Sequence, residues 1–348
     1  MCIRDRALTK VDQTMVSDQV FGRRNIFING DMRVAQRSTS NSSSGSGYHT
    51  VDRWDVAISS AGTYTFSQST TVPSGEGFAY SQKIDCTTAD ASLGSGDYFI
   101  WRQKIEGVNL QHLKYGTSSA EKLTLSFWVR SAKTGTYIVE FYNNNSAGIK
   151  LQSQTYTISS ADTWEKKTIT IDGDTALAFQ NTTDGELLMY WWLAAGSNYS
   201  GGDSLNNSWN SSVANNTRAV GVVNLADSTS NDWYITGVQL EVGENATPFE
   251  HLTYQETAML CYRYYYQMAD QTNPLYGTTY NGSTATRSFC TYSLPVPMNH
   301  TPTSTQTVAA GSLSSTYHTV EFLQFYLIPS NGDSGGGYVD YFTAEAEL

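Results

Sequence analysis

The sequence predicts an all-β protein with a β-sandwich followed by a smaller C-terminal β domain, and three observations lead to this prediction. Charged residues make up only 15% of the 348 residues, whereas the chain holds 23 Tyr and 8 Trp, which favour strands. Short segments of alternating apolar and polar residues recur and are separated by Gly-, Asn- and Ser-rich turns. All tryptophans lie between Trp54 and Trp233, so composition changes near residue 250, where we place a domain boundary.

We expect three parts in the chain. Residues 1–21 form an N-terminal tail, in which residues 1–6 (MCIRDR) resemble a translated sequencing-adapter scar, so that the true N-terminus would be missing. Residues 22–250 form the sandwich and residues 253–348 the C-terminal domain. A short helix is predicted at the junction, because Thr253 and Glu256 have the spacing of a capping box.

The sandwich is predicted to contain about ten strands. The clearest is Leu123–Arg130, which alternates apolar and polar residues over its whole length. A turn at 133–135 is predicted to fold it into a hairpin with Thr136–Tyr142. The other strands are predicted around Tyr48–Ile58, Tyr64–Phe66, Phe78–Ile84, Tyr98–Ile105, Trp164–Ile171, Glu186–Ala194, Ala219–Leu225 and Trp233–Glu241.

Three of these strands carry further information. Tyr98–Ile105 and Glu186–Ala194 carry bulky side chains on both faces, which predicts central, buried positions. In the last strand the apolar phase switches at Thr236–Gly237. A β-bulge there would keep residues on both sides of the switch facing one core.

The C-terminal domain follows from shorter segments. One helix face is predicted from Ala258, Cys261 and Tyr265, and a turn from the three glycines at 335–337. The strands are predicted at Cys261–Met268, Ser288–Leu294, Thr307–Ala310, Thr316–Leu327 and Tyr338–Ala344. A domain of this size, roughly 95 residues, is near the lower limit for independent stability, and trimerisation would bury more apolar area.

The charge distribution excludes two classes of partner. Residues 1–167 carry 18 Lys+Arg and 15 Asp+Glu, and residues 168–348 carry 3 and 17, which gives net charges of +3 and −14. A nucleic-acid binder needs a basic track that the second half lacks, and an anionic membrane surface is disfavoured for the same reason. No apolar run is long enough to insert into a membrane. Neutral ligands such as sugars remain open.

The four cysteines, Cys2, Cys86, Cys261 and Cys290, are far apart and form no CxxC pair. Buried thiols are the favoured interpretation, and a Cys261–Cys290 disulfide is an unsupported alternative.

Several segments carry a resemblance to known families. Residues 101–142 contain a "SFWV" strand after a segment that ends in IEG, and residues 25–36, 51–54 and 233–241 fit the same scheme. This scheme resembles jelly-roll carbohydrate-binding modules of the cellulose- and xylan-binding type. The NGDMRVAQR, YHTVDRW, ITGVQLEVGENATPFEH and FTAEAEL segments together resemble bacteriophage tail-fibre or receptor-binding proteins, especially marine ones.

The resemblance implies a jelly-roll sandwich and a structural calcium in many such modules, held in part by an Asp pair before the last strand. Here Thr236 and Gly237 stand at those positions, which places calcium at that site in doubt. Asp31 and Glu241 remain available as ligands elsewhere. We expect no other cofactor.

Glycan binding requires exposed aromatic faces that stack on sugar rings, flanked by short polar side chains. Such combinations occur at three places, on the strand around residue 128, in the loop at 196–218 and on the strand around residue 100. The candidate glycan-binding residues are Trp128, Arg130, Tyr199, Asn206, Trp209, Tyr98 and Arg102.

Packing is the alternative for each candidate. Trp128 would pack under a loop or helix, and Tyr199 and Trp209 would fold their own loop onto the sandwich. The remaining aromatics are assigned either to core or near-core positions or to contacts between domains or subunits. The core set is Trp54, Trp164, Trp191, Trp192 and Trp233, and the contact set is Tyr262, Tyr264, Tyr265 and Tyr266.

Catalysis has little support in the sequence. The five histidines have no metal-ligand spacing, and there is no GxSxG elbow or P-loop. Asp172 and Asp174 flank a glycine and are interpreted as turn residues. We therefore expect no catalytic residues and no catalytic metal.

The resemblance implies a non-catalytic tail-fibre protein of the virion, made in the host cytoplasm. It would bind a host cell-surface glycan, associate as a homotrimer and contact other tail proteins. The alternatives are a purely structural fibre or decoration protein without a glycan site, and a glycan depolymerase with paired carboxylates in a groove.

Overall fold

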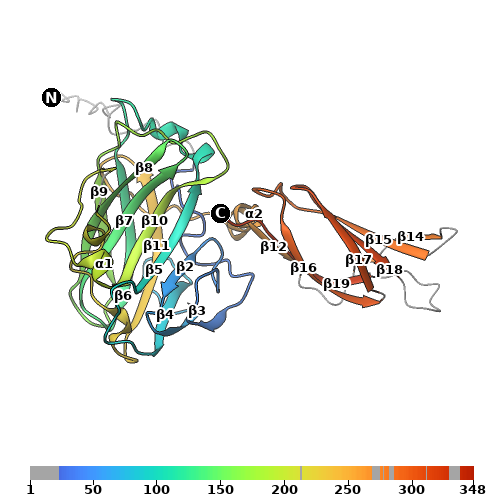
Figure 1. Ribbon diagram of the computed structural model, residues 1–348, viewed down its shortest axis with the longest axis horizontal. Helices are drawn as coiled ribbons and strands as arrows, with labels where there is room; N and C mark the ends of the chain where they lie inside the picture. Colours follow the sequence, from blue (N-terminus) through green and yellow to red (C-terminus); the bar gives the residue numbers. More distant parts are fainter. Residues whose placement is uncertain are drawn as a thin grey trace, which may run out of the picture.

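The computed structural model describes residues 23–211, 214–268, 275–276, 278–281, 286–310, 312–328 and 338–348. These residues form four antiparallel sheets, two in each of two layered units (Figure 1). The predicted all-β class is confirmed. The whole N-terminal tail, with the predicted scar, and the predicted turn at 335–337 lie outside the described residues. No helix within the described ranges is long and apolar enough to cross a membrane.

The larger unit is a jelly-roll sandwich of a six-stranded and a five-stranded sheet. The first sheet has the order β1 (Ser40–Ser43), β3 (Thr63–Ser69), β4 (Ser81–Thr88), β11 (Asp232–Val242), β6 (Leu123–Ser131) and β9 (Glu165–Ile171). The second has the order β2 (Asp55–Ser59), β5 (Tyr98–Glu106), β10 (Gly185–Ala195), β7 (Gly135–Asn145) and β8 (Gly148–Ile158).

The path of the chain through the sandwich corrects one prediction. Strands β4, β5, β6 and β7 alternate between the two sheets, so the turn at 133–135 does not form a hairpin. Strand β6 pairs with β9 and β11, whereas β7 pairs with β8 and β10. The reason is the core: Phe127 of β6 and Tyr137 of β7 are both fully buried and both pack on Tyr156, so the two strands face each other across the interior.

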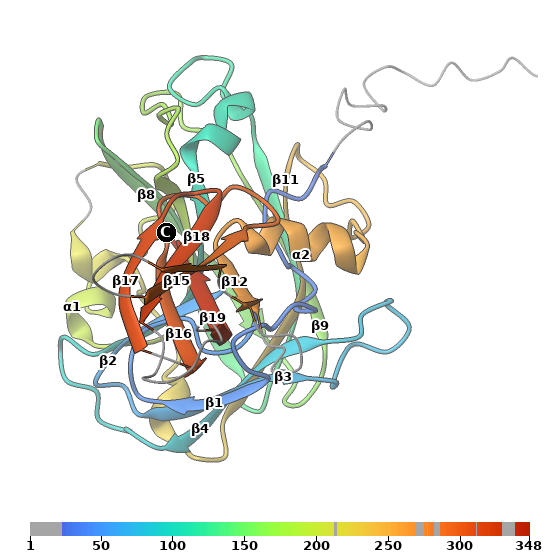
Figure 2. The same cartoon turned by 90° about the vertical axis from the view of Figure 1, so that its right-hand side faces the viewer.

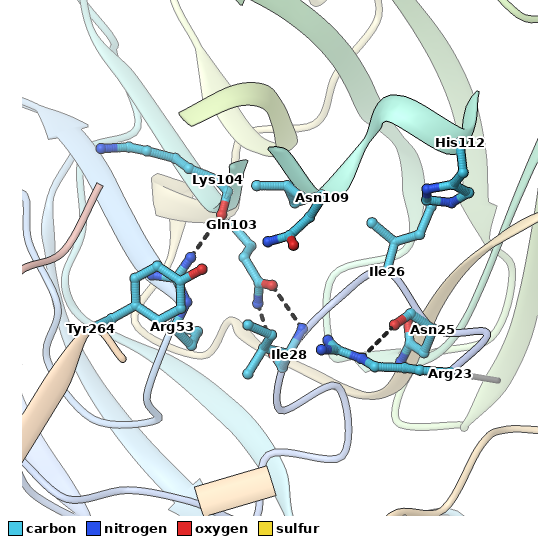
Figure 3. A pocket seen from close by; sticks show the side chains of 11 residues that line it. Arg23, Asn25, Ile26, Ile28, Arg53, Gln103, Lys104, Asn109, His112 and Tyr264 are labelled. Carbon is cyan, nitrogen blue, oxygen red and sulfur yellow. Dashed lines mark hydrogen bonds between the residues drawn. The ribbon is translucent and has the colours of Figure 1, made fainter. Parts of the chain in front are cut away.

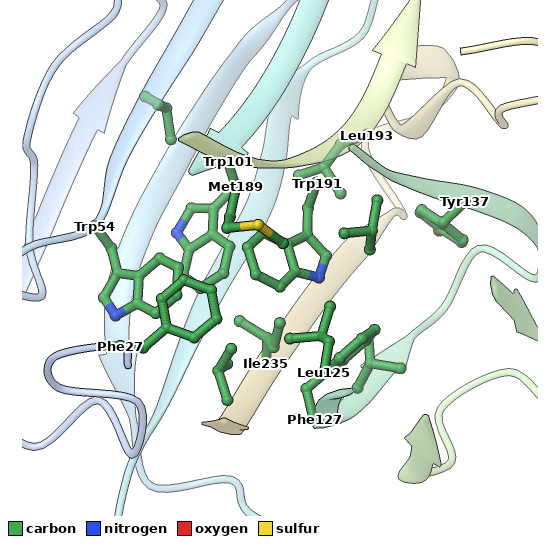
Figure 4. Close-up of a cluster of buried hydrophobic side chains, with 14 of the residues drawn as sticks. Phe27, Trp54, Trp101, Leu125, Phe127, Tyr137, Met189, Trp191, Leu193 and Ile235 are labelled. Atoms are coloured by element: carbon green, nitrogen blue, oxygen red, sulfur yellow. The ribbon is translucent and has the colours of Figure 1, made fainter. Parts of the chain in front are cut away.

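The core of the sandwich is built largely from aromatic rings (Figure 4). The indoles of Trp54 and Trp101 stack with ring centroids 4.0 Å apart, and Trp191 meets Trp101 edge to face at 5.2 Å. Tilted and edge-to-face contacts of this kind stabilise aromatic pairs beyond the area they bury. The core assignment is confirmed for Trp54, Trp191, Trp192 and Trp233, whereas Trp164 is only half-buried.

The bulge predicted in the last sandwich strand is present. The β11–β6 register skips two residues between Thr236 and Gln239, and Gly237 has a φ of 62°. Because of this shift Ile235 and Val238 both point into the core and are fully buried. The amide of Val238 donates to the carbonyl of Gly30, so the bulge also fixes the N-terminal segment.

Short helical segments connect the strands. They are η1 (Gly107–Asn109), η2 (Gln111–Leu113), α1 (Ser197–Ser200), η3 (Asn215–Thr217) and η4 (Leu225–Asp227). The strand predicted at Ala219–Leu225 is wrong, because this segment runs as turns into η4. Asn224 caps η4 by accepting a hydrogen bond from the amide of Ala226, a local pattern that competes with strand formation.

The smaller unit begins with helix α2 (Tyr254–Tyr262), whose predicted capping box between Thr253 and Glu256 is confirmed. Its first sheet joins β12 (Tyr265–Met268), β19 (Tyr338–Glu345), β13 (Leu275–Tyr276) and β16 (Thr303–Ala310). Its second sheet has the order β14 (Thr278–Asn281), β15 (Thr286–Ser293), β18 (Phe322–Ile328) and β17 (Ser312–His318).

Two strand predictions in this unit were wrong in extent. The segment Cys261–Met268 starts as the end of α2 and becomes a strand only at Tyr265. The segment Thr316–Leu327 is a hairpin of β17 and β18, closed by a hydrogen bond from the amide of Thr319 to the carbonyl of Phe322. Apolar residues stand on both sides of that turn, so the sequence pattern indicated one continuous strand. The predicted buried thiols are confirmed at the described positions, since Cys86, Cys261 and Cys290 are all buried.

The two units meet at a joint around α2, and the C-terminal end of β19 returns to it (Figures 1 and 2). A small apolar cluster crosses the joint, in which Ile28 and Val34 of the sandwich contact Cys261 and Tyr264. Among the described residues, no sheet takes strands from both sides of residue 250. The boundary at residue 250 is compatible with this arrangement and stays a prediction.

Candidate functional site

The seven predicted glycan residues do not form one site. Trp128 and Arg130 project from β6, on the six-stranded sheet. Tyr98 and Arg102 project from β5, on the five-stranded sheet. The described part of the loop at 196–218 carries the other three candidates. Tyr199 and Asn206 lie against the five-stranded sheet, whereas Trp209 packs against the main core.

Trp209 anchors its loop. Its indole Nε1 donates a hydrogen bond of 2.8 Å to the carbonyl of Asp172, and its ring meets that of Tyr115 edge to face at 5.8 Å. The neighbouring Asn210 forms a β-bridge with Leu151 of β8. These contacts match the packing alternative for this tryptophan.

Tyr199 and Asn206 attach the same loop to the five-stranded sheet. The ring of Tyr199 lies 5.4 Å from both Tyr98 and Trp192. The side-chain amide of Asn206 donates to the carbonyl of Leu151 at 2.9 Å. The structure thus brings two predicted residues, Tyr98 and Tyr199, into contact, but their ring faces are engaged with each other and with Trp192.

Arg102 is held by an ion pair. Its guanidinium donates to the carboxylate of Asp55 over 2.8–3.1 Å. Burial disfavours the charged form of Arg102 and by itself would lower its pKa. The charge and the hydrogen bonds of Asp55 together have the larger effect, so the pKa of Arg102 is raised. Beside it, Arg218 of the loop pairs with the buried Glu140 and lies over the Trp192 ring at 5.3 Å. Most polar groups on this face therefore already have protein partners.

Trp128 lies in a different environment, a groove of about 410 Å³ on the outer face of the six-stranded sheet. We call it the Trp128 groove. Its lining residues are Glu76, Phe78, Ser126, Trp128, Lys166, Gly237, Ala246, Thr247, Pro248, Phe249 and His251.

One wall of the Trp128 groove is a cluster of three rings. Phe78 meets Phe249 at 5.2 Å and His251 at 5.4 Å, and Phe249 meets His251 at 5.0 Å. The bulge makes room for this wall, because a Cβ on Gly237 would lie 2.5 Å from the Cζ of Phe78.

The backbone behind this wall is fixed by side chains of β11. Gln239 Oε1 accepts the amide hydrogen of Glu250 at 2.8 Å, and Glu241 accepts both the amide and the hydroxyl of Thr247. The segment that carries Phe249 is therefore preorganised.

Trp128 itself is half-buried opposite this wall, with Thr236 and Lys166 as its cross-strand neighbours. Within the described part of the chain, its indole N–H has no hydrogen-bond partner and its ring has no aromatic or cation–π partner. Arg130, two residues further along, differs: it pairs with Asp162 at 2.7 Å and lies over the Tyr234 ring at 4.8 Å. Among the candidates, Trp128 is therefore the one whose indole ring is available to stack on a ligand.

The sequence did not single out the other residues of this groove. Phe78 comes from one segment, and Phe249 and His251 come from another segment far away in the chain. The two segments meet beside the bulge at Gly237. A usable signal was the TPFEH segment, in which two aromatic residues follow a proline at the end of a turn.

The groove offers one carboxylate, Glu76, among its lining residues. A glycosidase places two carboxyl groups across the scissile bond, so this lining lacks the second one. The described residues also contain no group of three or more His, Cys, Asp or Glu side chains able to hold a metal ion. Asp31 pairs with Arg33, and Glu241 is engaged with Thr247, so neither is directed to a common cation site.

Comparisons with known proteins give weak similarities. No protein-family model matches the chain, and no curated protein matches it. The enzymatically active domain of tailspike protein 4 from bacteriophage CBA120 is similar over 63% of this chain and 21% of its own, at 12% identity and a TM-score of 0.33. This chain therefore spans about a fifth of that protein.

Two carbohydrate-binding modules are similar over their full length. The xylan-binding CBM22-1 domain from Paenibacillus barcinonensis has 8% identity and a TM-score of 0.28 over 65% of this chain. The family 11 module from Clostridium thermocellum, in complex with a mixed-linked tetrasaccharide, has 12% identity and a TM-score of 0.27 over 66%. None of these similarities assigns a ligand or an activity to this chain.

Proposed function

We propose that this chain is a non-catalytic tail-fibre protein of a virion that recognises a host cell-surface glycan, and that the glycan binds in the Trp128 groove. The observation that carries the proposal is the free indole of Trp128 at the side of a preorganised groove. The tail-fibre assignment is supported by the resemblance of the segments near the two ends of the sandwich, NGDMRVAQR and ITGVQLEVGENATPFEH.

The chemistry of the groove suits a sugar. A pyranose ring presents an apolar C–H face that stacks on an indole, and its hydroxyls need donors and acceptors at the edge. Glu76 provides an acceptor, Lys166 a donor and His251 either role. The volume of about 410 Å³ is within the range of small-ligand sites, roughly 300–1,000 Å³.

Glycan-array binding of the full chain tests this proposal, with Trp128→Ala and Trp209→Ala compared at equal folded fraction. Losing the stacking face should weaken binding by about 1 kcal/mol or more, at least fivefold. Trp209→Ala is the matched control, because its indole anchors a loop on a different part of the surface. It should lower stability and leave the affinity of the folded protein unchanged.

Retained binding in folded Trp128→Ala would contradict the assignment of the groove. Absence of binding by the well-folded chain, across glycans that include those of the host, would favour the second candidate, a purely structural fibre or decoration protein. The observation that favours this second candidate is that Tyr199, Asn206 and Trp209 all contact other parts of the protein.

Association as a homotrimer is part of the proposal, as is contact with other tail proteins. Several copies of a weak sugar site on one particle would raise avidity well above the affinity of one groove. Mass measured in solution on the array sample tests the trimer, and a monomer across the working concentrations would contradict it.

A further inference from the structure

A second cavity, at the joint between the two units, has a different chemistry from the Trp128 groove. It has a volume of about 160 Å³, and we call it the Arg53 pocket (Figure 3). It is bounded by the N-terminal segment, by Arg53, by β5 with the following η1 and η2, and by Tyr264, which lies between α2 and β12. Its lining residues are Arg23, Asn25, Ile26, Ile28, Arg53, Gln103, Lys104, Ile105, Asn109, His112 and Tyr264.

The lining of the Arg53 pocket is cationic. It contains Arg23, Arg53 and Lys104, and no aspartate or glutamate is among the lining residues. The chain as a whole has 32 Asp+Glu against 21 Lys+Arg, for a net charge of −11. Because the chain has more acidic than basic residues, a small cavity lined by three basic side chains and no acidic one differs from the average composition.

Arg53 lies at the buried end of this cavity. It is 1% exposed, pairs with Glu347, donates to the carbonyl of Lys104 at 2.8 Å and lies over the Tyr264 ring at 3.4 Å. Its Nε is buried and has no hydrogen-bond partner in the described structure. A buried guanidinium N–H without an acceptor is costly, and a ligand oxygen would satisfy it.

Arg23 is less well compensated than Arg53. It donates to the carbonyls of Asn25 and Phe27 at 3.0–3.1 Å, and none of the ion pairs among the described residues includes it. Carbonyl oxygens carry only partial charge, so the charge of Arg23 remains partly unbalanced. The third cation, Lys104, donates through Nζ to a main-chain oxygen of Leu348.

The ionisation of these groups points the same way. Desolvation lowers the pKa of Arg23 and of Lys104, and the carboxylates of Glu250 near Arg23 and of Asp55 near Lys104 offset this only in part. Glu347 raises the pKa of Arg53, in the same pocket, against the effect of burial. An anion beside Arg23 and Lys104 would act on them as Glu347 acts on Arg53.

We propose that the Arg53 pocket is a binding site for a small oxyanion, a phosphate, a sulfate or the carboxylate of an acidic sugar. Guanidinium groups bind such oxygens with directed, charge-assisted hydrogen bonds, and an ammonium adds a point charge. The cavity is smaller than the usual range for drug-sized ligands, about 300–1,000 Å³, and suits a single anionic group. Asn109 and His112 lie exposed at its edge and would contact whatever carries that group.

Isothermal titration calorimetry of the full chain with sodium phosphate, sodium sulfate and galacturonate tests the site, with sodium chloride and galactose as matched solutes. We expect saturable binding of at least one oxyanion that chloride at equal ionic strength does not reproduce. Galacturonate binding more tightly than phosphate and sulfate, with no binding of galactose, would identify an acidic sugar as the source. Stronger binding of phosphate or sulfate than of galacturonate would identify the free ion.

Variants locate the binding. Arg23→Gln and Lys104→Met should each weaken it at least tenfold, whereas Lys122→Gln, an exposed lysine paired with Asp172 and Glu244, should leave it unchanged. Trp128→Ala should also leave it unchanged, which separates this site from the proposed glycan groove. Equal heats with chloride, or full binding by both pocket variants in their folded state, would overturn the proposal.

Discussion

Gly237 is the residue on which the shape of the Trp128 groove depends most directly. Its φ of 62° lies in the left-handed region, and a Cβ there would come within 2.5 Å of Phe78. Both the backbone conformation and the close approach of a ring therefore require glycine.

The first prediction concerns this position. Gly237→Ala should lower the free energy of unfolding by about 1–3 kcal/mol, from backbone strain together with the clash against Phe78. Gly221→Ala is a matched control, because Gly221 has a φ of 83° and open space around its Cβ position. Urea unfolding of both variants measures the difference. Equal losses of stability would show that the Phe78 ring can move away from the new methyl group without destabilising the protein.

The second prediction concerns Asp52, which is fully buried and accepts the amide hydrogen of Gln36 at 2.9 Å. Burial raises the pKa of Asp52 from 3.8 to about 6. The folded state therefore binds a proton more tightly than the unfolded state, so this group's contribution to stability is lost as pH rises from about 4 through about 6.

Asp52→Asn removes that titration. Between about pH 4 and pH 8 the stability of the variant relative to the wild type should rise, by an amount on the order of 3 kcal/mol. Urea unfolding across this range measures it, since other titrating groups cancel in the comparison. A constant difference between the two proteins at all pH values would exclude a raised pKa at this position.

The sequence predicted single residues well where the signal was local. The bulge at Gly237 followed from a phase switch within one strand, and the thiols of Cys86, Cys261 and Cys290 followed from the lack of paired spacing. The ring wall of the groove could not be predicted, because Phe78 and Phe249 are 171 positions apart and meet only through the fold. The seven glycan candidates stay predictions until binding is measured.

At the level of elements, strand periodicity identified the strands but not their partners. The segment Leu123–Arg130 is strand β6 almost to the residue, yet its partner is not the strand that follows it. A short turn between two strands is compatible with a hairpin and with a crossing between sheets. The choice depends on how the buried faces pack, and this information is not local.

Helix α2 supports the third prediction. Glu256 accepts hydrogen bonds from the amide and the hydroxyl of Thr253 at 2.8 Å, and the Thr253 hydroxyl accepts the Glu256 amide. Thr253→Ala should cost about 1 kcal/mol, whereas Thr253→Ser keeps the cap and should cost a few tenths. Chemical denaturation followed by circular dichroism measures both, and identical midpoints would show that the cap does not limit stability.

For the whole molecule, the joint depends on charged side chains as well as on apolar packing. Arg263 donates two hydrogen bonds of 2.7 Å to Glu106, whose side chain is fully buried, and the Tyr264 hydroxyl donates to the same carboxylate. Removing one partner of such a pair leaves a buried charge without compensation.

The fourth prediction follows from this pair. Arg263→Ala should destabilise the protein by about 3 kcal/mol and should expose residues 243–253 to proteolysis before either unit unfolds. The double variant Glu106→Gln/Arg263→Met should recover part of the loss, because it removes the buried charge as well. Limited proteolysis and urea unfolding of the wild type and the two variants test this, and a double variant no more stable than Arg263→Ala would contradict it.

The ion pair between Arg53 and Glu347 joins residues 294 positions apart, which has a consequence for the order of events during synthesis. The last sandwich strand ends at Val242, about 100 residues before Glu347 is made. At translation rates of roughly 5–20 residues per second, the sandwich has about 5–20 s on the ribosome before that partner exists. During this interval Arg53 has no carboxylate from the C-terminal unit, so in any sandwich that folds before synthesis is complete this guanidinium lacks the partner that Glu347 later provides.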